Sequence, residues 1–206
     1  AAEGHIAQKK AEDWGFVAQK LGFDFDWGGG FGVKTGLFPQ FEEQVIEVLP
    51  DGSRKIINED GAIVIQKDDA TGIPAEVDHT LKDRQTWEKH YLPRLQFSED
   101  RLTASEERLD ALRKGDWEDP LGVWAGSLYG KIRNWLGLVN SAYIQVDDPD
   151  LFDEMIDTVG ELCYQCVTFS LELGVPFDYA AMWEDICFKS GPLINPRVFR
   201  EKVGPH

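Results

Sequence analysis

The chain has 206 residues, of which 42% are hydrophobic and 28% charged, an ordinary composition for one large soluble globular domain. Its 37 acidic residues outnumber 21 lysines and arginines, and the formal net charge of −16 argues against nucleic acid or an anionic membrane as partner. No apolar run approaches the ~20 residues of a membrane span, and three cysteines are too few for a disulfide framework, so we expect a cytoplasmic protein.

The N-terminal region predicts a helix, a strand and a glycine-rich loop. Residues 6–21 have helical spacing of apolar side chains, and residues 23–27 alternate apolar and acidic as a half-buried strand does. The glycines of 28–32 are expected to form a loop, and their spacing does not fit the dinucleotide-binding fingerprint. Asp24 and Asp26 are therefore candidate catalytic residues at a strand end, unless they simply form a solvated strand face.

The next region predicts a small antiparallel meander over about 42–67. Its strands are separated by two turn signals, at 50–53 and at 60–61. A helix capped by Asp83 should follow, and a second helix should cover about 105–112.

The C-terminal half alternates strands and helices. Residues 121–125 form a short apolar run suited to a buried strand, and a helix is expected over 128–136. A long helix should begin at Asp148 and Pro149, and a strand over 177–182 should lead to a helix that opens near Asn195. This order predicts parallel βα units, so the fold class is α/β.

Two architectures fit this order of elements. A complete (β/α)8 TIM barrel needs ~250 residues, more than this chain has. Because the sequence stops inside a predicted helix, we expect one incomplete barrel domain over 1–206 that carries the meander as an insertion. The alternative is a smaller open α/β sheet that acts as a non-enzymatic binding module.

The strongest candidate site follows the strand at 177–182. Glu184 and Asp185 are neighbouring carboxylates at the end of a strand, where α/β barrels place their chemistry, and one can act as acid while the other acts as base. Trp183 and Lys189 beside them are candidates for binding substrate. The structural alternative is that the carboxylates pair with Lys189 or Arg197, or cap backbone amides.

Arg133 and the cysteines complete the candidates. Arg133 lies in the first turns of the helix after 121–125, where it can bind a substrate carboxylate or form a surface ion pair. Cys163 and Cys166 lie on the apolar stripe of the long helix, which indicates core packing rather than a metal or redox pair.

Three segments resemble the uroporphyrinogen decarboxylase superfamily. They are PLGVWAGSLYGKIRNWLG at 120–137, DDPDLFDEMIDTVGELC at 147–163 and FDYAAMWEDICFKSGPLINPRVFREKVGPH at 177–206. The resemblance implies a βα barrel that removes carboxylates from the acetate side chains of a tetrapyrrole without metal or cofactor. A sister branch transfers methyl groups between corrinoid proteins and thiols or folates, often with zinc.

The resemblance also implies roles for individual residues. Asp24 or Asp26 would hold pyrrole N–H groups, Glu184 or Asp185 would carry the proton, and Arg133 would place substrate carboxylates. The chain departs from the family at two places: the site tyrosine is expected at about Arg133 or Asn134, where no tyrosine stands, and Glu184 is near the place of the site serine.

We therefore expect a decarboxylase of the porphyrin-biosynthesis type that acts on a small tetrapyrrole substrate and needs no cofactor or metal. A corrinoid-dependent methyltransferase, with corrinoid or zinc, is the alternative. Neither nucleic acid nor membrane is expected as a partner, and a homodimer is compatible with the sequence.

Overall fold

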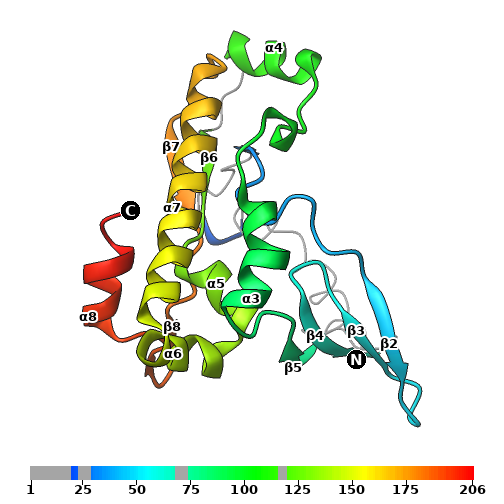
Figure 1. Cartoon of the computed structure of the whole chain (residues 1–206). Helices are drawn as coiled ribbons and strands as arrows, with labels where there is room; N and C mark the ends of the chain where they lie inside the picture. The colour runs from blue at the N-terminus through cyan, green and yellow to red at the C-terminus, as the bar shows by residue number, and fades with distance from the viewer. Residues whose placement is uncertain (1–19, 23–28, 68–73, 116–119) are drawn as a thin grey trace.

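The computed structural model describes residues 20–22, 29–67, 74–115 and 120–206. These residues form a mixed α/β fold with a parallel sheet, an antiparallel meander and a short hairpin. Figure 1 shows the long helix α7 beside the parallel sheet, with the meander on the side of the molecule away from α8. The predicted α/β class is confirmed at this level.

The parallel sheet has three strands in the order β1-β6-β7. They are β1 (Gly29–Phe31), β6 (Leu121–Gly126) and β7 (Tyr179–Met182), and β6 pairs in parallel with both neighbours. The predicted strands at 121–125 and 177–182 are confirmed. The loop predicted over residues 28–32 is wrong for β1, because Gly29, Gly30 and Phe31 pair with Leu121, Gly122 and Val123.

Glycines are needed in and beside the parallel sheet because neighbouring segments approach closely there. A Cβ on Gly32 would lie 2.7 Å from the Cβ of Trp124, and a Cβ on Gly122 would lie 2.5 Å from the Tyr179 ring. A side chain at either position would have to displace its neighbour. Gly29 and Gly30 therefore belong to an edge strand beside β6 rather than to a turn.

Three helices follow β6 and build the main core. They are α5 (Tyr129–Leu136), α6 (Leu138–Asp147) and α7 (Pro149–Glu172). Asp148 caps α7 by accepting a hydrogen bond from Leu151 N at 3.0 Å, and Pro149 occupies the first turn, as predicted. The predicted stripe of α7 is buried from Phe152 to Cys166. Helix α6 was not predicted.

The meander has four antiparallel strands in the order β2-β3-β4-β5. Strands β2 (Gln44–Val48), β3 (Arg54–Ile57) and β4 (Ala62–Gln66) confirm the predicted meander, and β5 (Ala75–His79) adds a fourth strand. The buried face is small, formed by Ile56, Ala62 and Val64. The meander is fixed to the core partly through Asp60, which accepts a hydrogen bond from Trp135 Nε1 at 3.3 Å.

Short helices connect these parts. Asp83 and Thr86 form a capping box at α3 (Arg84–Thr86), as the prediction of a cap at Asp83 requires. The chain continues through η1 (Trp87–Tyr91), η2 (Leu92–Leu95), η3 (Glu99–Arg101) and α4 (Glu106–Lys114). After β7 come the hairpin β8 (Cys187–Phe188) and β9 (Gly191–Pro192), then α8 (Pro196–Val198) and η4 (Phe199–Val203).

Within the described ranges the three parallel strands form an open sheet, and no closed barrel is present. The same ranges contain no helix both long and apolar enough to cross a membrane.

Candidate functional site

The carboxyl ends of the three parallel strands meet at one edge of the sheet. Register places Gly126 at the end of β6 opposite Met182 at the end of β7, and Phe31 at the end of β1 opposite Val123. Three segments therefore leave this edge together: the loop after β1, the start of α5 and residues 183–185. Open α/β sheets bind their ligands at such an edge.

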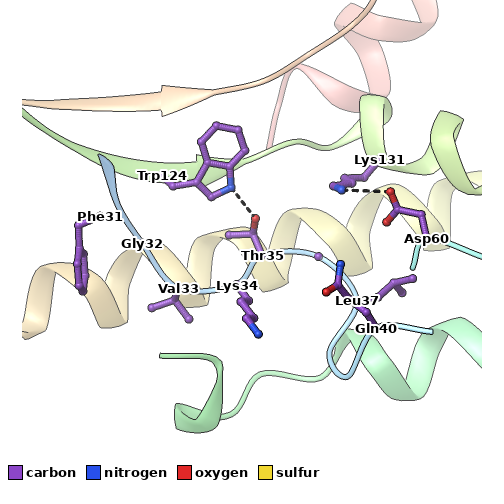
Figure 2. Close-up of a pocket in the computed structure, with 11 residues that line it drawn as sticks. Phe31, Gly32, Val33, Lys34, Thr35, Leu37, Gln40, Asp60, Trp124 and Lys131 are labelled. Carbon is purple, nitrogen blue, oxygen red and sulfur yellow. Dashed lines mark hydrogen bonds and ion pairs between the residues drawn. The ribbon is translucent and has the colours of Figure 1, made fainter. Parts of the chain in front are cut away.

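A pocket of about 480 Å³ opens between the loop after β1 and the strand β6. Figure 2 shows Trp124 on one side of it and the pair Lys131 and Asp60 on the other. The indole Nε1 of Trp124 donates to Thr35 Oγ1 at 3.0 Å, and Lys131 Nζ lies 3.6 Å from Asp60 Oδ2. We call this the sheet-edge pocket. It places an ammonium group and an exposed indole at one apolar opening.

The loop after β1, which forms one wall of the sheet-edge pocket, is held in place by the buried guanidinium of Arg101. Arg101 is fully buried, and its N–H groups donate to the carbonyls of Lys34 at 2.7 Å, Gly36 at 2.8 Å, Arg94 at 2.6 Å and Gln96 at 2.9 Å. Burial lowers the pKa of Arg101 from its ordinary value. No described carboxylate forms an ion pair with it, so four carbonyl dipoles compensate the buried charge.

Glu184 caps the start of α5. Its two carboxylate oxygens accept hydrogen bonds from the backbone N–H groups of Leu128 and of Gly130, the latter at 2.9 Å. The N-cap residue Leu128 has no side chain able to satisfy these donors, so Glu184 supplies the cap from a distant part of the chain. This is the amide-capping role that the sequence left open as an alternative. Catalysis by Glu184 stays a hypothesis.

Ser127 lies at the same helix start. It is almost fully buried, and its hydroxyl has no hydrogen-bond partner among the described residues. A Cβ built on Gly130 would lie 2.6 Å from that hydroxyl and 2.9 Å from the Trp183 ring. Gly130 is thus required for the close approach of Ser127 and Trp183 to the first turn of α5.

Asp185 and Arg133 form an ion pair across the same edge. Arg133 Nη2 lies 2.8 Å from Asp185 Oδ2, and the arginine side chain is largely buried whereas the aspartate side chain is 43% exposed. Two candidates from separate parts of the sequence are therefore brought together. For Arg133 the structure agrees with the alternative of an ion pair within the protein, because the carboxylate that Arg133 binds is that of Asp185.

The two substrate-binding candidates lie in different places. Trp183 begins the segment after β7, and its backbone N–H donates to the carbonyl of Gly126 at 3.0 Å. Lys189 lies exposed in the turn between β8 and β9, with its ammonium 5.7 Å from the centre of the Phe188 ring. Neither lines the sheet-edge pocket. Asp24 and Asp26 lie outside the described residues.

The cysteines of α7 are core residues. Cys163 and Cys166 are buried, and burial raises their pKa to about 12 and about 11. Such thiols remain protonated and are poor metal ligands or nucleophiles. Among the residues that the structure describes, no group of three or more His, Cys, Asp or Glu side chains is arranged to hold a metal ion.

The residues of the sheet-edge pocket were not among the predicted site residues. Two signals in the sequence could have indicated them. Trp124 is a large aromatic residue within an otherwise aliphatic strand, and Lys131 is the first charged residue of the helix that follows. Asp60 comes from the meander, 71 residues before Lys131 in the chain, and only the fold brings them together.

Comparison with protein-family models, with curated proteins and with solved structures gives no match for this chain.

Proposed function

We propose that the chain is a uroporphyrinogen-decarboxylase-like enzyme that removes a carboxylate from an acetate side chain of a tetrapyrrole, within a βα barrel. The observation that carries the proposal is that Lys131 and Trp124 line one pocket at the carboxyl edge of a parallel sheet. In a protein of net charge −16, an anionic substrate needs such a local cation. The indole offers a face to a planar ring.

The size of the pocket fits part of such a substrate. A volume of about 480 Å³ is typical for a small-molecule site and suits one pyrrole ring with its acid side chains. In this proposal Lys131 binds a substrate carboxylate in exchange for its contact with Asp60, which at 3.6 Å is a weak ion pair. Arg101 holds the opposite wall in place.

The reaction breaks the bond between the acetate CH2 and its carboxylate, releases CO2 and forms a C–H bond with one proton. We assign the proton transfer to Asp185, which does not line the sheet-edge pocket but lies partly exposed beside Arg133 at the same carboxyl edge of the sheet. Glu184 acts through α5, because both of its oxygens are occupied by that helix. Asp24 or Asp26 is the proposed partner of the pyrrole N–H groups.

An anaerobic assay with uroporphyrinogen tests the proposal. We expect products with fewer carboxylates, which chromatography and mass spectrometry resolve after oxidation to porphyrins. Lys131→Gln should raise KM, Asp185→Asn should lower kcat, and Lys114→Gln, at an exposed lysine of α4, should change neither. If no CO2 is released, the proposal fails; methyl transfer from methylcobalamin to a thiol would then establish the methyltransferase alternative.

A further inference from the structure

A second pocket lies between the meander and the helical segment that follows it. Its volume is about 480 Å³, and we call it the meander groove. The groove is lined by the following residues: Pro39, Gln40, Phe41, Glu42, Gln44, Ile57, Thr80, Thr86, His90 and Arg94. Only Gln40 also lines the sheet-edge pocket.

The groove has an apolar wall beside a cationic one. Phe41 and Ile57 supply the apolar side chains, and the Arg94 guanidinium lies 4.6 Å from the centre of the Phe41 ring. A guanidinium on an aromatic face has a fixed orientation, which leaves its edge free for hydrogen bonding. His90 adds an imidazole for which the described residues provide no side-chain partner.

Arg94 is incompletely paired for a partly buried arginine in an acidic protein. Its Nη1 donates to the carbonyl of His90 at 3.0 Å, but its buried Nε has no hydrogen-bond partner among the described residues. No described carboxylate forms an ion pair with it either, although the chain has 37 acidic residues. A cation in this state is suited to an anionic ligand.

The acidic residues around the groove do not provide the missing partner. Glu42 lines the groove but is exposed, so solvent screens its charge. Glu59 accepts a hydrogen bond from Gln40 Nε2 at 3.1 Å.

We infer that the meander groove is a second ligand site, distinct from the sheet-edge pocket, for a small carboxylate with a planar apolar body. The carboxylate binds Arg94, and the apolar body packs on Phe41 and Ile57. This site does not depend on the proposed decarboxylation, because it lies on the meander side of the fold and shares none of the proposed catalytic residues.

Calorimetric titration with 1-naphthaleneacetate tests the site, and the neutral 1-naphthaleneacetamide is the matched control ligand. We expect saturable binding of the acid, with affinity at least about tenfold above that of the amide, because a charge-assisted hydrogen bond is lost. Arg94→Met should weaken binding of the acid about tenfold. It keeps the backbone carbonyl of residue 94, which accepts from Arg101 and Phe38.

Two control variants locate the binding. Arg108→Met replaces an exposed arginine of α4, and Lys131→Gln replaces a residue that lines the sheet-edge pocket but not the meander groove. Neither should change the affinity for the acid. Amide NMR signals of Phe41, Thr80 and His90 should shift on addition of the acid to the wild-type protein. The assignment would be overturned by any of three results: absence of saturable binding, equal affinity for acid and amide, or NMR shifts confined to Gly32–Leu37. The NMR experiment uses the wild-type protein, so it tests the site even if Arg94→Met does not fold.

Discussion

Replacement of Arg101 by methionine should be strongly destabilising. The side chain is fully buried and donates four hydrogen bonds to backbone carbonyls of residues 34, 36, 94 and 96. Methionine fills a similar volume but removes all four of these hydrogen bonds, although the carbonyl of residue 94 keeps its hydrogen bond from Phe38 N at 2.9 Å. A net loss of about 1 kcal/mol for each hydrogen bond gives roughly 4 kcal/mol. That is a large fraction of the ~5–15 kcal/mol by which domains are stable.

Urea denaturation followed by circular dichroism measures this loss, with Arg108→Met as the control at an exposed arginine. The control should change the free energy of unfolding by less than about 0.5 kcal/mol. Arg101→Lys should be intermediate, because a single ammonium group cannot reproduce the planar fork that spans all four carbonyls. Hydrogen exchange at the Lys34 amide, which donates to the Arg101 carbonyl at 3.2 Å, should accelerate in Arg101→Met. A decrease in the free energy of unfolding of less than about 1 kcal/mol would show that the four hydrogen bonds of Arg101 do not hold the loop in place.

Three further predictions concern the cap of α5, the turn before β3 and the cysteines. Glu184→Gln leaves one carbonyl oxygen for two backbone donors, so the free energy of unfolding should fall by about 1 kcal/mol in urea titrations. Glu43→Gln, at an exposed glutamate, should leave it unchanged, and equal values for the two variants would contradict the cap. The Ser53 hydroxyl, together with the Ser53 N–H and Lys67, lowers the pKa of Asp51 from 3.8 to about 2. This carboxylate therefore stabilises the fold above pH 3.8, and the contribution is lost as the pH falls toward 2. NMR titration should show a higher midpoint for Asp51 in Ser53→Ala. Iodoacetamide should alkylate the exposed Cys187 of the native protein, whereas Cys163 and Cys166 should react only after unfolding; mass spectrometry that finds three rapid adducts would count against their burial.

Helix ends could be predicted because their signals are local. Asp83, Ser105 and Asp148 each accept a hydrogen bond from a backbone N–H in the first turn of a helix, at the positions that the sequence indicated or within one residue. Each signal involves a side chain and an amide only a few residues apart, so its effect depends little on the rest of the fold.

The missed elements lack such local signals. Helix α6 buries Ser141 and Ile144 but exposes Val139, Tyr143 and Val146, so its apolar stripe does not mark the face that packs. Strand β5 alternates apolar and acidic residues, but four of its five residues are exposed, so the alternation marks no buried face. Strand β1 consists of two glycines and a phenylalanine, residues that do not by themselves indicate a strand. It forms because it pairs with β6, which lies far away in the sequence.

The candidate site illustrates the same limit at the level of single side chains. The sequence shows that acidic residues follow a predicted parallel strand. The structure places these residues, Glu184 and Asp185, at the carboxyl edge of the sheet. What each does depends on partners 52 to 56 residues earlier: one carboxylate caps α5, and its neighbour pairs with Arg133. Adjacent residues of similar chemistry thus acquire different roles from the same helix. Because α5 also carries Lys131 into the sheet-edge pocket, the cap by Glu184 and the position of that ammonium are coupled through one short helix. If the sheet-edge pocket binds substrate as we propose, a change at Glu184 should therefore weaken that binding by displacing Lys131, although Glu184 itself does not line the pocket.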